Sequence, residues 1–133
     1  MKVTSELLKL VADPTRMRIL MVLSRKELCV CQIMGVLEVS QSLISKNLHL
    51  LDSAGFLSER KDGKLVYYSL RKDMPLPQSR LISLLADLLK GDNILMGDLQ
   101  SLRDCEELQK KAAKCDMKTF REFMDRKKKK KLI

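Results

Sequence analysis

The residues of this sequence best suited to chemistry are four cysteines: Cys29, Cys31, Cys105 and Cys115. We expect a cytoplasmic protein without a membrane partner. Its N-terminus lacks a signal-peptide pattern, and no segment approaches the roughly 20 apolar residues that span a bilayer. Cysteines stay reduced in that compartment, so the four are better explained as ion ligands or buried thiols than as a disulfide framework.

Two of the cysteines lie close together in residues 27–36, "ELCVCQIMGV". The apolar pattern predicts a helix over 28–36. Because a helix turns about 100° per residue, Cys29 and Cys31 then point to nearly opposite sides. If both thiols bind one ion, the first helical turn must distort, and ion binding is coupled to the position of the helix. The alternative is that Cys31 faces the core and only Cys29 is reactive.

The other two cysteines share one broad face of a helix predicted from about Ile94 to Lys114. On a straight helix Cys105 and Cys115 would lie about 15 Å apart. They can share an ion only if the chain bends near 115–116, or if just one of them joins Cys29 and Cys31. Their polar, lysine-rich setting, "DCEELQKKAAKCD", favours a role as ligands. The alternative is that both are small apolar core residues, a common role of free cysteine.

The remaining residues argue against an enzyme. His49 is the only histidine, so this chain alone cannot assemble a histidine-based zinc site or a histidine-dependent triad. The sequence has no C-x-x-C beside a βαβ pattern and no glycine-rich phosphate loop. A thiol-dependent redox enzyme therefore remains only as an alternative that these features disfavour.

The elements that must position the cysteines follow the order helix, helix, helix–turn–helix, hairpin, helix. Asp13 and Pro14 fit the N-cap and first position of the second helix. Ser40 caps the fourth helix, which stops at Gly55. Asp62–Gly63, between two β-rich runs, is a hairpin signal. This order predicts a mainly α fold with a small β-hairpin, a winged helix-turn-helix.

The fourth helix predicts DNA recognition. Leu43, Ile44, Leu48 and Leu51 form its inner stripe, and its outer stripe carries hydrogen-bonding groups with almost no acid. Such a face suits base edges and phosphates, whereas an ordinary solvated face is more often rich in Glu and Lys. The predicted groove contacts are Gln41, Ser42, Ser45, Lys46 and His49. The predicted phosphate contacts of the hairpin are Arg60, Lys61 and Lys64.

The charge balance agrees with a nucleic-acid partner, because the formal net charge is +9. Six of these cations form the tail from Arg126 to Lys131, so the rest of the chain carries only 9 − 6 = +3. Lysine runs are usually solvated, disordered chain ends. The tail by itself is therefore a poor indicator of DNA contact.

We predict a homodimer built from two regions. Residues 1–91 form the DNA-binding and dimerisation domain, and residues 92–133 form a helical extension with two cysteines and the basic tail. The segment "LISLLADLLKG" has more apolar positions than one core-facing stripe needs. We expect it to pair with a second copy, together with the N-terminal helix. A two-fold dimer would bind palindromic DNA.

Four blocks of this sequence resemble the ArsR (ArsR/SmtB) family of bacterial winged-helix repressors. The blocks are "VADPTRMRIL" (11–20), "ELCVC" (27–31), "LEVSQSLISKNLHLLDSAGFL" (37–57) and "RKDGKLVYYSL" (60–70). The resemblance covers roughly residues 4–90. It implies a homodimer that represses a resistance operon and releases operator DNA when a toxic metal or metalloid ion binds.

The ion site departs from the sites of known members of that family. In the best-known arsenic site a third cysteine stands where this chain has Met34, and a thioether cannot replace a thiolate toward trivalent arsenic. The histidines of zinc-sensing relatives are missing, and no cysteine precedes Cys29. The resemblance therefore implies that Cys105, Cys115 or both complete the site. Three thiolates suit As(III) or Sb(III), and four suit Zn(II) or Cd(II). Sensing of Cd(II), Pb(II) or Zn(II), or of thiol oxidation, stays as the alternative.

Overall fold

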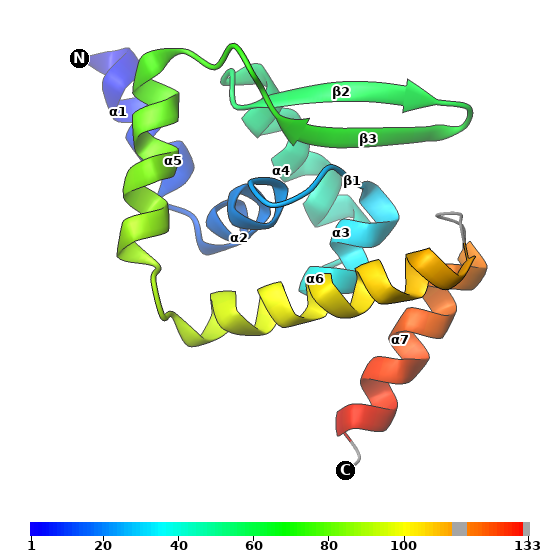
Figure 1. Ribbon diagram of the computed structural model, residues 1–133. Coiled ribbons are helices and arrows are strands. Elements are labelled where there is room, and N and C mark those ends of the chain that lie inside the picture. Colours follow the sequence, from blue (N-terminus) through cyan, green and yellow to red (C-terminus); the bar gives the residue numbers. More distant parts are fainter. Residues whose placement is uncertain (113–116, 132–133) are drawn as a thin grey trace.

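The computed structural model describes the backbone of residues 1–112 and 117–131 and the side chains of 1–109 and 121–129. Helices dominate, and the strands form one small sheet (Figure 1). The elements are α1 (Lys2–Val11), α2 (Pro14–Leu23), β1 (Leu28–Cys29), α3 (Val30–Leu37), α4 (Gln41–Ser53), β2 (Leu57–Asp62), β3 (Leu65–Leu70), α5 (Leu76–Leu88), α6 (Asn93–Ala112) and α7 (Met117–Lys131). The predicted mainly α fold with a β-hairpin is confirmed.

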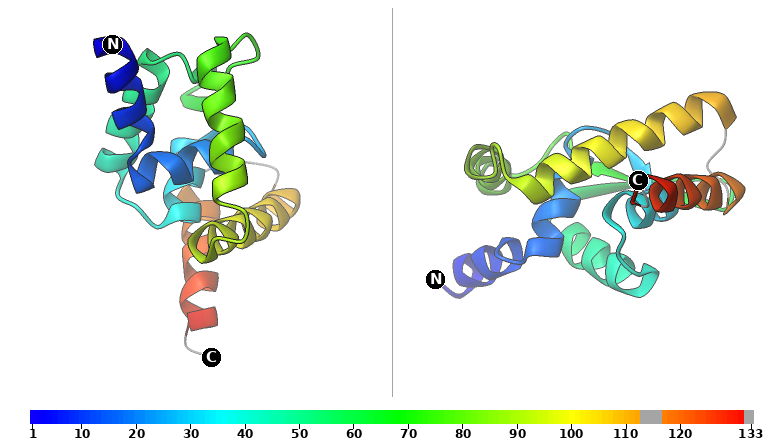
Figure 2. Two further views of the ribbon diagram at one scale, coloured as in Figure 1. Left: turned by 90° about the vertical axis from the view of Figure 1, so that its left-hand side faces the viewer. Right: turned by 90° about the horizontal axis from the view of Figure 1, so that it is seen from below.

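The helices surround α2, which lies in the middle of the molecule. Figure 2 shows α4 and α6 on opposite sides of α2, and Figure 1 shows α1 and α5 at the end away from the tip of the β2–β3 hairpin. The three strands are antiparallel in the order β1–β3–β2. Within the described residues, no helix is both long enough and apolar enough to cross a bilayer.

Local capping explains where the helices begin. Asp13 accepts a hydrogen bond from the Arg16 N–H at 3.0 Å, and Pro14 takes the first helical position. Ser40 accepts from the Leu43 N–H at 3.4 Å at the start of α4. Both predicted caps are confirmed. The hairpin turn needs a left-handed residue, which Gly63 supplies at φ 61°.

Three of the sequence-based expectations are wrong. The helix predicted over 28–36 begins only at Val30, because residues 28 and 29 pair with Tyr68 and Tyr67 of β3. The prolines of residues 71–79, "RKDMPLPQS", predict a linker, but α5 already begins within this segment at Leu76, since proline is compatible with a first helical turn. Leu43 is 41% exposed, because it lies about 100° from the stripe that buries Ile44.

The C-terminal helices pack on the rest of the molecule. Leu102 and Leu108 of α6 and Phe123 of α7 join the same buried core as α2, α3 and α4. Two cations also bind the end of α3, where unpaired carbonyls and the helix dipole favour positive charge. Lys127 donates to the Gly35 and Val36 carbonyls at 2.5 and 3.0 Å. Its side chain is only 11% exposed, so this lysine of the basic tail is structural.

The second cation is Arg18, which fastens α6 to the same place. Its guanidinium donates to both carboxylate oxygens of Asp98 at 2.8 Å and to the Leu37 carbonyl at 2.9 Å. The Asp98 side chain is 6% exposed and that of Arg18 is 26% exposed. The hydrogen bond to Asp98 raises the pKa of Arg18. This cluster ties α2, α3 and α6 together.

The variant Asp98→Ala is expected to lower the free energy of unfolding by about 2–4 kcal/mol, because it leaves a partly buried guanidinium without its carboxylate. Urea unfolding followed by circular dichroism measures the change. Asp87→Ala is the matched control, since it removes an exposed acid from α5 and should cost less than about 0.5 kcal/mol. Equal losses in the two variants would contradict a special role of Asp98.

Candidate functional site

The predicted groove residues lie together on the solvent face of α4. Ile44, Asn47, Leu48 and Leu51 are buried on the opposite face. The turn before α4 is short, because Glu38 ends α3 in the left-handed conformation at φ 56° and Ser40 caps the next helix. The residues exposed on the outer face are Gln41, Ser42, Ser45, Lys46 and His49. This arrangement presents hydroxyl, amide, ammonium and imidazole groups without a carboxylate.

A hydrogen-bond network that the sequence did not reveal fixes the position of α4. Asn47 is 3% exposed and accepts a hydrogen bond from Arg16 Nη1 at 3.0 Å. The Asn47 amide donates to the Leu43 carbonyl at 3.0 Å, and Arg16 Nε donates to the Leu10 carbonyl at 2.6 Å. The network joins α1, α2 and α4 and satisfies a buried amide that would otherwise be costly. A polar residue at a core-facing position of a helical pattern was its only signal in the sequence.

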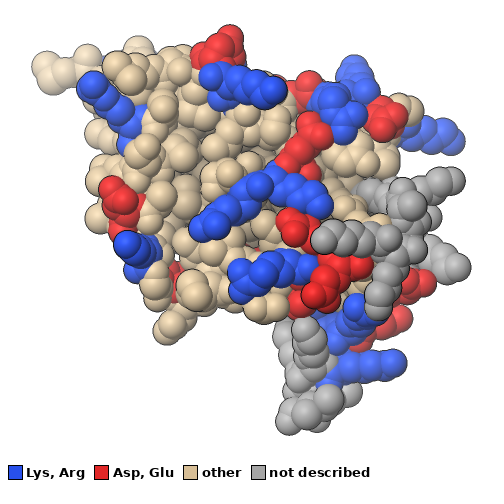
Figure 3. Space-filling view, in the orientation of Figure 1, with Lys and Arg blue, Asp and Glu red and all other residues tan. Residues whose placement is uncertain are grey.

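The three predicted cations of the hairpin are exposed but not equivalent. Lys61 and Lys64 lie free on the hairpin among the described residues. Arg60 instead forms an ion pair with Glu27, at 2.7 Å between Nη2 and Oε1. The face shown in Figure 3 mixes acidic and basic side chains among its described residues, so it carries no uniformly basic patch.

The first two cysteines have different backbone environments. Cys29 ends β1 and is the N-cap residue of α3, and its backbone N–H donates to the Gln32 side-chain oxygen at 2.8 Å. The Cys29 side chain is 1% exposed, whereas Cys31, in the first turn of α3, is half-buried. Cys29 thus precedes the helix, so the prediction that the two thiols point to opposite sides of one helix is wrong. Burial, and then the nearby Cys29, raises the pKa of Cys31.

The third described cysteine approaches the same region from α6. Cys105 is 7% exposed and belongs to the buried core, as the apolar alternative predicted. Burial raises its pKa to about 11; Lys26 acts in the opposite direction, and Cys29 is close enough to raise the pKa further. Because α6 packs against α3, the Cys105 thiol lies within electrostatic reach of Cys29. Cys115 lies outside the described residues.

These thiols do not form a ready-made ion site. Among the described side chains, no group of three cysteine, histidine or acidic residues is arranged to hold a metal ion. The kind of donor nevertheless fits a soft, thiophilic ion. Binding such an ion to these thiols would require the site to rearrange, and would displace protons from buried thiols.

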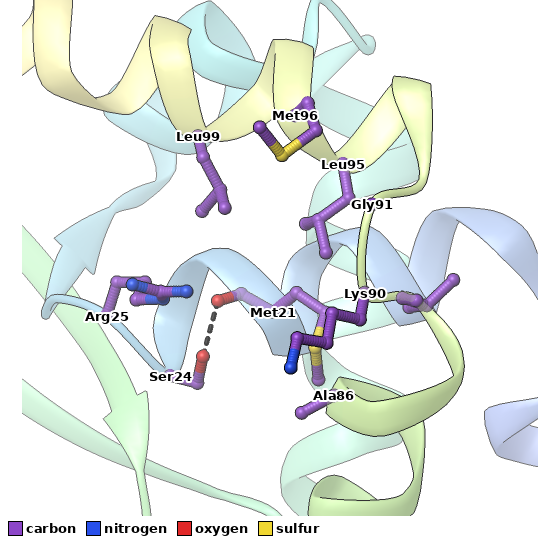
Figure 4. Close-up of a pocket in the computed structure, with 10 residues that line it drawn as sticks. Met21, Ser24, Arg25, Ala86, Lys90, Gly91, Leu95, Met96 and Leu99 are labelled. Atoms are coloured by element: carbon purple, nitrogen blue, oxygen red, sulfur yellow. Dashed lines mark hydrogen bonds between the residues drawn. The ribbon is translucent and has the colours of Figure 1, made fainter.

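A cleft of about 220 Å³ lies elsewhere, between the end of α2 and the junction of α5 and α6 (Figure 4). Its walls are largely aliphatic or thioether groups, including Met21, Leu95 and Met96, and Arg25 and Lys90 are its cations. The Ser24 hydroxyl donates back to the Met21 carbonyl. None of the described residues that line the cleft carries a thiol, imidazole or carboxylate, so they offer no anionic or imidazole ligand to a metal ion.

Comparison with known proteins agrees with the helix–turn–helix geometry. Residues 13–59 match the family model described as "Bacterial regulatory protein, arsR family". The arsenical resistance operon repressor of Escherichia coli (strain K12) is 42% identical over 78 residues, which are 58% of this chain and 67% of that protein. A cadmium resistance transcriptional regulatory protein CadC homolog of Staphylococcus aureus is 45% identical over 67 residues, which cover 50% and 55% of the two chains.

A solved structure shows the same fold. Reduced HlyU from Vibrio cholerae N16961 matches with a TM-score of 0.57 and 33% identity, over 65% of this chain and 88% of that one.

The sequence matches cover only part of the two curated relatives. The aligned part of the E. coli repressor is about two thirds of its length, and that of the staphylococcal protein is about half. The two curated relatives are named as a repressor and a regulator, and neither is named as an enzyme.

Proposed function

Because the chain belongs to the arsR family of bacterial regulatory proteins, we propose that it is a homodimeric repressor that As(III) or Sb(III) releases from palindromic operator DNA. The observation that carries the proposal is the exposed face of α4, preceded by a three-residue turn and followed by the hairpin wing. In this arrangement the second helix enters the major groove. Gln41, Ser45 and His49 read base edges, and Lys46 and Ser42 contact groove edges or phosphates.

The signal enters at the other end of α3. Cys29 and Cys31 lie at its N-terminus, and the turn into α4 follows its C-terminus. When bound, the metalloid would supply strong bonds to thiolate sulfurs. Drawing Cys105 or Cys115 toward Cys29 would shift α3 against α6. The shift would reach α4 through the turn, and a ligand that prefers the shifted state lowers the population that binds DNA.

A divalent ion is the second candidate signal. The similarity to a protein named for cadmium resistance supports it. A site that used all four cysteines would offer the tetrahedral thiolate set that suits Cd(II) or Zn(II). The number of cysteines that the response requires therefore separates this candidate from As(III) or Sb(III), for which three thiolates suffice.

A direct test uses the full chain and a fluorescent duplex from the region upstream of its own gene. Anisotropy at fixed salt measures operator binding, and additions of As(III), Sb(III), Cd(II), Zn(II) and Pb(II) measure release. We expect tight binding to this duplex, weaker binding to a scrambled one, and release at the lowest concentrations of As(III) or Sb(III). Equal binding to both duplexes would contradict the proposed operator-specific repression. Release by Cd(II) alone would show that the signal is a divalent ion and not a metalloid.

The variant Lys64→Ala is expected to weaken binding to operator and scrambled DNA alike. Lys64 lies in the hairpin turn, where it can reach a phosphate but carries no sequence information. Its loss should lower the slope of log affinity against log salt by about one unit. Lys90→Ala, at the α5–α6 junction, is the matched control and should leave the slope unchanged. A change of base preference in Lys64→Ala would contradict the proposal that the hairpin contacts only phosphates.

A further inference from the structure

Arg60 of β2 is held by a carboxylate in the free protein. Its Nη2 lies 2.7 Å from Glu27 Oε1, and its Nε donates to both oxygens of that carboxylate at 3.1 and 3.2 Å. The guanidinium also stacks over Tyr67, 4.6 Å from the ring centroid. The Glu27 carboxylate thus accepts from Nε and Nη2 of Arg60, which are donors that a DNA phosphate could also use.

The sheet places these groups beside one another. Arg60 pairs with Tyr67 across β2 and β3, and Tyr67 pairs on its other side with Cys29 of β1. Glu27 lies immediately before β1. The carboxylate therefore reaches Arg60 because an antiparallel ladder fixes both strand ends, and the contact joins residues 33 positions apart in the chain.

The ion pair is exposed enough for DNA to compete with it. The Arg60 side chain is 53% exposed and that of Glu27 is 35% exposed. Exposed ion pairs contribute little to stability, since solvent screens both partners. Polyanionic DNA presents closely spaced phosphates to the same surface. Exchanging the carboxylate for a phosphate replaces one anionic partner of the guanidinium with another.

We infer that Glu27 is a positioning residue for DNA binding, because it holds the guanidinium of Arg60 in the free protein and competes with an operator phosphate for it. The inference rests on the proposed repressor function. Glu27 thereby lowers the affinity for DNA of any sequence. Arg60 offers its Nε and Nη2 donors to a phosphate only after they leave the Glu27 carboxylate. Lys61 and Lys64 need no such exchange.

A double-mutant cycle tests this role by anisotropy on the full chain with the upstream duplex. The variant Glu27→Gln is expected to raise affinity about two- to fivefold. In an Arg60→Ala background the same change should give only the smaller gain that general charge repulsion explains, and Arg60→Ala alone should lower the salt slope by about one unit. The conservative variant Glu27→Asp should stay near the wild type. Melting temperatures within about 2 °C of wild type would show that the fold is intact.

Glu59→Gln is the matched control, because it removes a neighbouring acid that forms no ion pair with Arg60 among the described residues. Its effect should be the same in both backgrounds, as expected for general charge repulsion. An equal gain from Glu27→Gln with and without Arg60 would overturn the inference, as would an unchanged salt slope in Arg60→Ala. In both results the wild type still binds DNA. Failure of the wild type to prefer its upstream duplex would instead defeat the proposed function.

Discussion

Cys29→Ser and Cys31→Ser are each expected to bind operator DNA within about twofold of wild type and to lose release by As(III). Serine is a favoured N-cap residue, so the start of α3 is preserved at position 29. The groove-facing side of α4 is untouched by either change. A neutral hydroxyl is a poor substitute for a thiolate, so the As(III) concentration for half-release should rise more than about tenfold.

Two further variants separate the proposed ligand sets. Cys105→Ala keeps a small apolar group in the core, and Cys115→Ser removes the thiol outside the described residues. If only one of these two variants abolishes release, the site uses a single C-terminal cysteine, and three thiolates bind a metalloid. If both abolish it, four thiolates or a site shared between subunits is supported. Normal release from Cys29→Ser and Cys31→Ser would exclude these thiols from the signal, whatever the other two variants do.

Leu88→Asp is expected to give a monomer with more than about 100-fold weaker operator binding. Leu84 and Leu88 of α5 are 51% and 71% exposed, and Val3 and Leu8 of α1 are 77% and 51% exposed. α1 and α5 lie at one end of the molecule (Figure 1), and large apolar groups gathered at one end are typical of an interface. A monomer loses the second half-site and the gain from binding both at once.

Sedimentation at micromolar concentration and anisotropy on the same samples measure both effects. Because Leu88 is exposed in the monomer, the helical content of Leu88→Asp should match the wild type. Met96→Asp is the control, since Met96 of α6 is 53% exposed and lies in a different helix. A dimeric Leu88→Asp, or a Met96→Asp variant that dissociates equally, would show that α5 does not form the interface.

Local chemistry in the sequence was sufficient to predict the order of the main elements and the polar, exposed face of α4. Capping by Asp13 and Ser40 and the turn at Gly63 act over a few positions, and the structure confirms them. In α4 it also confirms the burial of Ile44, Leu48 and Leu51, but not that of Leu43. These interactions lie within one helix or one turn. They are therefore visible in the periodicity and residue types of the chain.

Contacts between distant segments decided the rest. Cys29 lies in a strand because β3 pairs with it from 38 positions away, and the helical pattern of its own segment does not record that pairing. The sequence pattern predicts that Lys127 belongs to a solvated lysine run, but its ammonium binds carbonyls of α3 about 90 positions earlier in the chain. Cys105 lies near Cys29 only because α6 folds onto α3.

The candidate site divides in the same way. The sequence alone determined which residues could read DNA and which thiols could bind an ion, because residue type sets donors, charge and softness. The tertiary structure decided that Glu27 forms an ion pair with Arg60 and that Cys105 is buried within electrostatic reach of Cys29. The physical reason is that ion pairs and burial depend on which surfaces meet after the chain folds, and those surfaces come from residues 33 positions apart for one pair and from α6 and α3 for the other.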